Sequence, residues 1–519
     1  MKTIYYRLYN KFFPKNCKII FFKLSTLYKK IASNTLSQVI SKALTAFISI
    51  FLIGILTKYL PIEMYGNYNK VYNYLWIFAF LADLGLYTIT VREISRKKVL
   101  PEIIVWNVLT LRTILGFGMW IIAFILAFFL PWYHDTLTLI AIFIVWAFTV
   151  VSLINSSLLA FMQSQMKMEF SLISVVSGKL INIWLISFFL IYVFTDISQK
   201  PVAFLSVFIA GLLWIICNTW LNYFYAKKFV KIRYRFDRDY LLYIFKISLP
   251  YGLALFLSVI YFKVDIILLS ILEPPELANI SIALYWLPMK IVEVLMVVGG
   301  FYLNSILPSL SEKYLEKKYD EISKIFFLSF KILWSFWILI LLLGNLFAEQ
   351  IVRIIATPEY ISPLIHSFNS VQALHIVFWV LLFHFLALCC IYMMIASERQ
   401  SLLLWINLWV TLLNIIGNII LIPHYSFLGA GVVTLITQAI LMCVTGIIVL
   451  RGIPIPRSYV LSFVWTCIFS AFLFFVFQRI LNLVDIGDIG KILLFTPIFI
   501  SIYIYGEYIS SKKVFNLFQ

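Results

Sequence analysis

Charged residues are scarce in this 519-residue chain. They make up 12% of it, whereas hydrophobic residues make up 63% and the mean hydropathy is +0.99. Soluble globular chains carry about 25% charged residues. A chain with so little polar surface cannot fold as the three or four water-soluble domains (roughly 150 residues each) that its length alone would suggest. The composition therefore predicts an integral membrane protein.

Acidic residues are the rarer charge, with 23 Asp and Glu against 41 Lys and Arg. In a soluble protein this balance would suggest a nucleic-acid partner. In a membrane protein, an excess of Lys and Arg is typical of cytoplasmic loops. Here Lys and Arg concentrate in alternate loops, beginning with the basic segment 1–32. The pattern predicts a multi-pass protein with both termini in the cytoplasm and no nucleic-acid partner.

Cysteines are few, and motifs for cofactors are missing. The six cysteines form no C-x-x-C pair, and the nucleotide-binding pattern G-x-x-x-x-G-K-[ST] does not occur. No loop is long enough for a water-soluble catalytic domain. We therefore predict no metal centre, no cofactor and no direct ATP hydrolysis, and interpret the cysteines as small core residues.

Apolar runs long enough to cross a bilayer, about 20 residues each, fill most of the sequence. They predict an all-α polytopic membrane protein with about 14 transmembrane helices. Segment 244–271 is expected to form one helix, and segments 401–422 and 428–450 to form two. Two helices are expected to bend, one at Pro250 and Gly252 and the other at Gly299-Gly300.

The halves of the chain show a weak internal repeat, because PIEM at 61–64 corresponds to PPEL at 274–277. Such parallel repeats are typical of transporters with a path between two halves. The predicted organisation is a basic cytoplasmic arm at 1–32, a first six-helix lobe at 33–227, a second six-helix lobe at 240–450, and helices 13 and 14 with a short tail at 451–519.

Eight charged residues are expected inside the predicted helices, where a charge costs about 2.5–3.5 kcal/mol at the bilayer centre and needs a reason. The bases are Lys42, Arg112, Lys179, Lys263 and Lys290, and the acids are Asp83, Asp265 and Glu293. The excess of bases suits an anionic cargo. A structural alternative remains: Lys290 and Glu293 are three apart and could neutralise each other, and Asp83 could pair with a base on a neighbouring helix.

Several short motifs, in a consistent order, resemble one family. They are LTKYLPIEMYG at 56–66, LADLGL at 81–86, YFKVDIILL at 261–269, LNIIGN at 413–418 and GAG at 429–431. The series is similar to polysaccharide-biosynthesis flippases of the Wzx type, the O-antigen transporters. These belong to the MOP superfamily together with MATE exporters and the lipid II flippase.

The resemblance implies a V-shaped bundle of two six-helix lobes with two additional C-terminal helices. It also implies a flippase of the bacterial inner membrane that moves an undecaprenyl-diphosphate-linked oligosaccharide by alternating access, for O-antigen, capsule or exopolysaccharide synthesis. Polysaccharide polymerase machinery and membrane lipids are the implied partners. The five intramembrane bases would line the cavity, with Arg112 as the strongest candidate because it stays charged at any pH. Asp83, Asp265 and Glu293 are candidates for coupling to a proton or sodium gradient.

Three other function classes remain open. A membrane glycosyltransferase or polysaccharide polymerase would also have many helices, but would need outer loops rich in acids or bases, and here those loops are short. A MATE-like ion-coupled exporter of cations would favour acids in the cavity, whereas the first predicted helix carries Lys42 and no acid. The third class is a scaffold or scramblase-like protein that transports no specific cargo.

Overall fold

The computed structural model describes residues 37–38, 40–96, 99–196, 199–231, 233–260, 263–453, 457–484 and 486–516. The predicted arm at 1–32 and Cys17 lie outside the described residues. Every regular element in the described part is helical, and twelve helices are long and apolar enough to cross a membrane. One of the twelve, Ser401–Leu450, contains two membrane crossings, and the broken pair α9–α10 supplies another.

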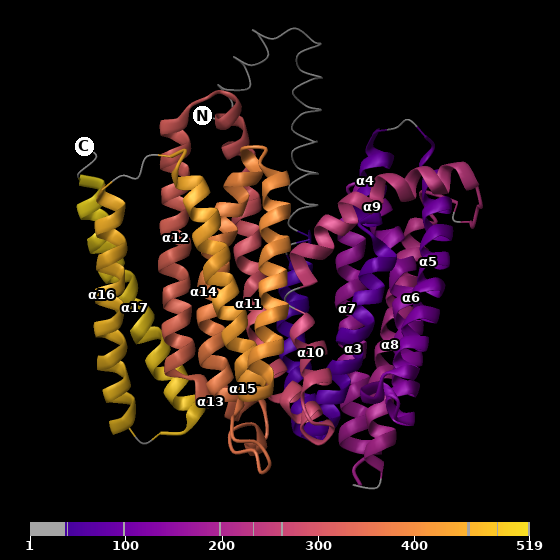
Figure 1. Ribbon diagram of the computed structural model, residues 1–519, viewed down its shortest axis with the longest axis horizontal. Helices are drawn as coiled ribbons and strands as arrows, with labels where there is room; N and C mark the ends of the chain where they lie inside the picture. Colours follow the sequence, from indigo (N-terminus) through magenta and orange to yellow (C-terminus); the bar gives the residue numbers. More distant parts are fainter. Residues whose placement is uncertain are drawn as a thin grey trace, which may run out of the picture.

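The first half of the chain forms one bundle, which we call the N-bundle (Figure 1). It consists of the helix Ile40–Tyr59 followed by α3 (Ile62–Asp83), α4 (Leu86–Arg96), α5 (Pro101–Phe129), η1 (Pro131–Tyr133), α6 (Thr136–Ser164), α7 (Met168–Phe188), the π-helical turn η2 (Phe189–Val193) and α8 (Lys200–Ala226).

The second half forms the C-bundle. It contains α10 (Val264–Leu272), α11 (Pro275–Leu315), α12 (Tyr319–Leu346), α13 (Ala348–Ile355), η4 (Pro358–Tyr360), α14 (Ser370–Ala396) and α15 (Gln400–Leu450). The last two helices, α16 (Arg457–Leu483) and α17 (Asp488–Asn516), pack against α12 at the side far from the N-bundle (Figure 1). This arrangement confirms the predicted all-α fold of two lobes and two additional helices.

Helix α9 (Arg238–Ile260) joins the two bundles, because it contacts α3, α4 and α5 on one side and α15 on the other. It runs through Pro250 without interruption and ends at Ile260, and α10 begins at Val264. The predicted single helix 244–271 is therefore two helices. The repeat motif lies at corresponding positions of the two bundles, since Pro61 immediately precedes α3 and Pro274 immediately precedes α11.

The bundles meet at one end and diverge toward the other (Figure 1). The C-terminal ends of α4, α8 and α11 lie at the diverging end, which we call the basic end because the segments that follow α8 and α11 carry Lys227, Lys228, Lys231, Arg233, Arg235, Lys317 and Lys318. At the opposite end, Thr57 donates a hydrogen bond to the carbonyl of Ile355 at 2.9 Å. There α3 and α11 also approach so closely that a Cβ on Gly66 would lie 1.7 Å from the carbonyl oxygen of Asn279.

Buried apolar side chains form three clusters, and one of them joins the bundles. Two clusters belong to the N-bundle, at its basic and opposite ends. The third combines the C-bundle core with N-bundle residues such as Ile53, Leu56 and Leu60. Cys389 and Cys390 are buried as expected, but Cys443 and Cys467 are exposed on outer helix faces, so the core interpretation was wrong for them. An apolar bilayer tolerates such outward-facing small residues.

Candidate functional site

A cavity of about 510 Å³ lies between the two bundles, and we call it the central cavity. Its N-bundle walls come from the helix Ile40–Tyr59, α3 and α7, and its C-bundle walls come from the start of α10 and from α11. Lys179, Lys263, Lys290 and Glu293 are its charged lining residues. Three lysines and one carboxylate give the cavity a surplus of positive charge.

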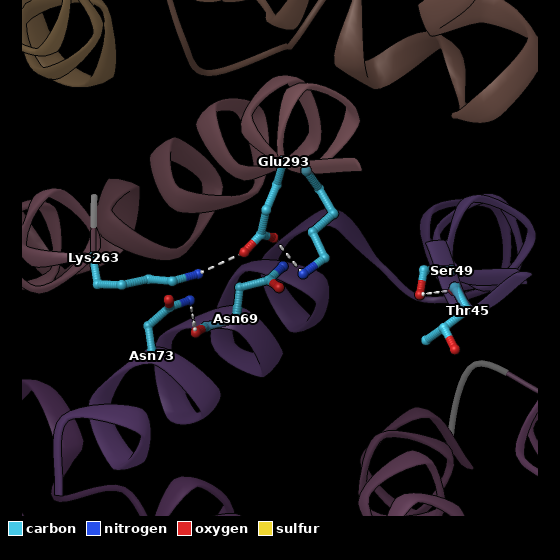
Figure 2. Close-up of polar contacts among 7 residues, drawn as sticks. Thr45, Ser49, Asn69, Asn73, Lys263 and Glu293 are labelled. Atoms are coloured by element: carbon cyan, nitrogen blue, oxygen red, sulfur yellow. Dashed lines mark hydrogen bonds and ion pairs between the residues drawn. The ribbon is translucent and has the colours of Figure 1, made fainter. Parts of the chain in front are cut away.

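Glu293 holds two of these lysines in place. Its Oε2 lies 2.6 Å from Nζ of Lys290 on the same helix, and its Oε1 lies 3.3 Å from Nζ of Lys263. Figure 2 shows Lys263 reaching toward Glu293 from the turn that precedes α10. The Glu293 side chain is 44% exposed and that of Lys263 only 13%. The carboxylate therefore orients the lysines at the cavity surface and leaves part of their charge uncompensated.

Tryptophan rings contact all three lysines. Nζ of Lys263 lies 4.3 Å from the ring centroid of Trp286, and Nζ of Lys179 lies 4.4 Å from that of Trp214. Lys290 is 5.4 Å from Trp286. A cation over an aromatic face is attracted by the ring quadrupole, which stabilises the charge without neutralising it. The aromatic neighbours therefore support a cationic site.

These aromatic residues were not among the predicted site residues, although the sequence contains two signals for them. Trp286 and Lys290 are four apart and therefore share one face of α11. The α3 residues Tyr65, Tyr68, Tyr72 and Trp76 recur at helical spacing and all line the central cavity. A stripe of this kind usually indicates core packing, and only the neighbouring lysines distinguish it as the wall of a site.

Small polar side chains complete the N-bundle wall. Asn73 donates to the carbonyl of Asn69 at 2.8 Å, and Ser49 donates to the carbonyl of Thr45 at 2.8 Å (Figure 2). Asn73 and Ser49 both line the cavity. The Ser49 hydroxyl hydrogen is used within its own helix, so Ser49 offers an oxygen acceptor to a bound molecule, and Asn73 offers its carbonyl oxygen together with one remaining N–H. The site thus combines cations, aromatic faces and neutral acceptors.

Arg112, the strongest candidate from the sequence, lies outside this cavity. It is fully buried in the N-bundle, where Nη2 lies 2.5 Å from Oδ1 of Asp83 and Nη1 donates to Oγ of Ser157 at 2.7 Å. The structure therefore shows the alternative that Asp83 pairs with a base on a neighbouring helix. Lys42 is also not part of the lining: it is exposed on the helix Ile40–Tyr59.

Asp265 is fully buried in the C-bundle and faces neutral donors. Its Oδ2 accepts hydrogen bonds from Thr434 at 2.7 Å and from Tyr285 at 2.8 Å. Its Oδ1 accepts from Asn418 at 2.9 Å, and Asn418 also donates to Asn414. Among the described residues, no base forms an ion pair with Asp265. It differs in this from Asp83 and Glu293, which both have basic partners.

In the described part of the chain, no group of three or more His, Cys, Asp or Glu side chains is placed to hold a metal ion. The described site consists of ammonium groups, aromatic rings and hydrogen-bonding oxygens.

Two family models match the chain. The model described as polysaccharide biosynthesis protein matches residues 27–312, which is more than half of the sequence. The chain belongs to this family. The MatE model matches residues 250–420, from the second half of α9 into α15. The search of curated protein sequences finds no match.

Solved structures with the same fold are transporters of the MOP superfamily. The lipid II flippase MurJ, in an inward closed conformation, matches with a TM-score of 0.67 and 14% identity, covering 94% of this chain and 100% of that chain. An outward-facing multidrug resistance MATE transporter matches at 0.54 and 16%, covering 81% and 95%. A MOP superfamily transporter from Pyrococcus furiosus matches at 0.53 and 14%, covering 80% and 94%. At these identities the matches establish the fold.

Proposed function

We propose that the protein is a flippase for a polyprenyl-diphosphate-linked oligosaccharide, moved across the bacterial inner membrane for surface polysaccharide synthesis. The observation that carries the proposal is the central cavity between the bundles, which is lined by Lys179, Lys263 and Lys290 but by only one carboxylate, that of Glu293. Membership in the polysaccharide biosynthesis family and a fold shared with the lipid II flippase support this cargo class.

The chemistry of the cavity matches the difficulty of the transport. A diphosphate that crosses hydrocarbon without compensation loses its hydration at a cost of tens of kcal/mol. Lysine ammonium groups supply strong hydrogen bonds to phosphate oxygens and restore much of that free energy. Because the lysines come from both bundles, a bound diphosphate connects the two halves that must move relative to each other during alternating access.

We also infer the orientation of the protein in the membrane from the distribution of Lys and Arg. Loops rich in Lys and Arg lie at the basic end, and such loops face the cytoplasm in most membrane proteins. The described C-terminal helix α17 ends there as well (Figure 1). In this orientation the bundles diverge toward the leaflet in which a lipid-linked sugar is assembled.

Asp265 is the proposed coupling residue. It is a buried carboxylate with three neutral donors and no basic partner among the described residues. A proton or a sodium ion could neutralise it, since the surrounding hydroxyl and amide oxygens can turn toward a cation. Asp83 and Glu293 are already neutralised by Arg112 and by the two lysines. Coupling through Asp265 therefore needs no ion pair to break.

The competing functions fit the cavity less well. An exporter of organic cations would meet repulsion from three lysines. A glycosyltransferase or polymerase needs a catalytic acid or base at a water-exposed loop, whereas the charged residues of this site line a cavity between the bundles.

Purified protein in liposomes tests the proposal. The probe is undecaprenyl diphosphate that carries a fluorescent disaccharide, and an impermeant quencher reports its transfer between leaflets. We expect transfer that depends on the protein. Equal transfer of a fluorescent phosphatidylcholine would indicate a scramblase instead, and appearance of an extended glycan would indicate a glycosyltransferase.

The coupling proposal has a separate test. Wild-type transfer is measured with an imposed proton gradient or an imposed sodium gradient, and Asp265→Asn is measured in parallel. We expect one gradient to accelerate the wild type and neither to accelerate the variant. A variant that retains the full response would exclude Asp265 as the coupling residue.

A further inference from the structure

A second cavity of about 320 Å³ lies between α3 and α6, and we call it the α3–α6 groove. One wall carries Tyr72, Trp76 and Asp83 from α3. The other carries Phe148, Ser152 and Ser156 from α6. The residues of each wall recur at helical spacing, so each wall is one continuous helix face. Its volume falls at the lower limit of ordinary ligand pockets, about 300–1,000 Å³.

The groove continues directly from the central cavity. Tyr72 and Trp76 line both spaces, and Nζ of Lys263 lies 5.9 Å from the ring centroid of Trp76. From these shared residues the groove follows α3 toward Asp83, and therefore toward the basic end. A molecule whose anionic group is bound by the lysines can extend its neighbouring part into the groove.

The polar groups of the groove are suited to a neutral ligand with many hydroxyls. Asp83 is 27% exposed, whereas Arg112 behind it is fully buried. Its Oδ1 accepts from Arg112, and its Oδ2 has no hydrogen bond to any described residue. The Ser152 and Ser156 hydroxyls likewise make none within the described part of the chain. The groove thus offers a carboxylate acceptor and two hydroxyls, while Arg112 cancels the net charge.

Aromatic rings supply the remaining surface on both walls. The rings of Trp76 and Phe80 lie 5.3 Å apart on α3, and the Tyr72 ring meets that of Phe148 edge to face at 6.0 Å across the groove. The apolar face of a pyranose ring packs on such surfaces while its hydroxyls need polar partners. A polyprenyl chain would leave the carboxylate and the serines desolvated at a cost, and an organic cation would find no net negative charge.

We propose that the α3–α6 groove is the sugar subsite of the cargo and binds the pyranose rings next to the diphosphate. This inference rests on the proposed flippase function and extends it, because it assigns the sugar and the diphosphate to separate side chains. The lysines of the central cavity bind the charge common to all such lipids. The groove residues bind the part that differs between them, and therefore determine specificity.

Binding to the full-length chain in nanodiscs tests the assignment with two probes. One is undecaprenyl diphosphate, and the other is the same lipid carrying a disaccharide. The groove variants are Phe148→Leu and the double variant Ser152→Ala/Ser156→Ala. Matched controls are Phe143→Leu on the exposed face of α6 and Ser501→Ala on α17. Each groove variant should lower affinity for the disaccharide lipid about tenfold, the effect of one or two lost hydrogen bonds or ring contacts. Affinity for the bare lipid should not change.

Lys263→Ala distinguishes the two proposals, because it should weaken binding of both probes. If it weakens neither while the groove variants act only on the disaccharide lipid, the groove assignment stands and the diphosphate site is wrong. If the groove variants affect both probes equally, or neither, the groove is not a sugar subsite. Equal affinity of the wild type for both probes would overturn it as well.

Discussion

Two clusters of charged side chains lie inside the protein. They differ in the ratio of bases to acids and in how far the side chains are exposed. The Arg112–Asp83 pair is one to one, and its base is fully buried in the N-bundle. The central cavity holds three lysines and one acid: Glu293, whose side chain is 44% exposed, pairs with Lys263 and Lys290, and Lys179 makes no ion pair with it. A pair with balanced charges and a buried base stabilises the fold and leaves no net charge for a ligand, whereas an unbalanced, accessible cluster retains binding capacity for an anion. The number of bases alone does not distinguish a structural pair from an anion-binding site. The number of acids that neighbour the bases does distinguish them.

The largest expected effect is on stability, from Arg112→Ala. The change leaves Asp83 without its base and should destabilise the protein by about 3–5 kcal/mol, as for other broken buried pairs. Membrane abundance and melting in detergent measure the loss. The double variant Arg112→Ala/Asp83→Asn should regain much of the abundance, because it removes the unpaired charge. Normal abundance of the single variant together with lost transport would instead place Arg112 in cargo binding.

The next effect is on transport, from Lys263→Gln and Lys290→Gln. A hydrogen bond to a charged group contributes about 1.5–3 kcal/mol, so each variant should transport the lipid-linked sugar about tenfold to 100-fold more slowly. Abundance should remain normal because both side chains are accessible from the cavity. Lys324→Gln, on an exposed face of α12, is the matched control. A comparable defect in the control would remove the distinction between cavity and surface lysines.

Glu293→Gln is expected to have a smaller effect, and to strengthen binding of the cargo instead of weakening it. Removing the cavity carboxylate increases the surplus of positive charge and frees Lys263 and Lys290. Affinity for undecaprenyl diphosphate should rise about fivefold, equivalent to about 1 kcal/mol for one charge at 4 Å in a water-like medium. Turnover should fall because release is slower. Weaker binding would show that Glu293 mainly positions the lysines.

The smallest expected effect is on stability, and it concerns a polar cluster outside the central cavity and the Arg112–Asp83 pair. Among the described residues, no ion pair is involved in this cluster. His366, in the loop before α14, lies 3.1 Å from Ser281 and 3.0 Å from Ser426 through Nε2, and its Nδ1 accepts from the amide of Phe368. Burial lowers the pKa of His366. The unfolded chain therefore binds a proton before the folded protein does, and stability should fall as the pH drops below about 6.5.

A melting series between pH 7.5 and pH 5 measures this loss, which should amount to about 2 °C or less of melting temperature. His366→Gln should remove the part due to the histidine. Burial raises the pKa of Glu273 nearby, which acts in the opposite direction at lower pH, so the difference between the two proteins is the relevant quantity. A variant with the same acid sensitivity as the wild type would exclude His366 as its source.

The fold was predictable because bilayer thickness imposes a length on every apolar helix. The break expected between 401–422 and 428–450 is present inside α15, at Ser426 with φ 52° and just after Pro423. The break between α9 and α10 was not expected, since no glycine or proline marks it. It places Lys263 in the cavity. Helix α11 continues through Gly299-Gly300 without a break, so the bend expected at this pair stays a prediction.

Close packing of two C-bundle helices requires a glycine at position 299. A Cβ at this position would lie 1.9 Å from a ring carbon of Phe385 on α14, so glycine permits the close contact of two C-bundle helices. The site was predictable in part, with three of the five proposed bases lining the central cavity. Arg112 could not be distinguished from them, because its partner Asp83 is distant in sequence and reaches it only through the packing of α3 against α5.

The apolar cluster that joins the bundles at the end opposite the basic end has a consequence for the protein when no cargo is bound. Parting the bundles there would expose Ile53, Leu56 and Leu60 to water, at about 1.5–3 kcal/mol for each side chain. A gap of 4–5 kcal/mol already limits the alternative state to about one molecule in a thousand or fewer. Without a cargo or gradient that offsets this cost, the empty protein stays shut on that side. An unloaded copy therefore leaves the membrane impermeable to ions, and the cell can keep many copies without dissipating its membrane potential.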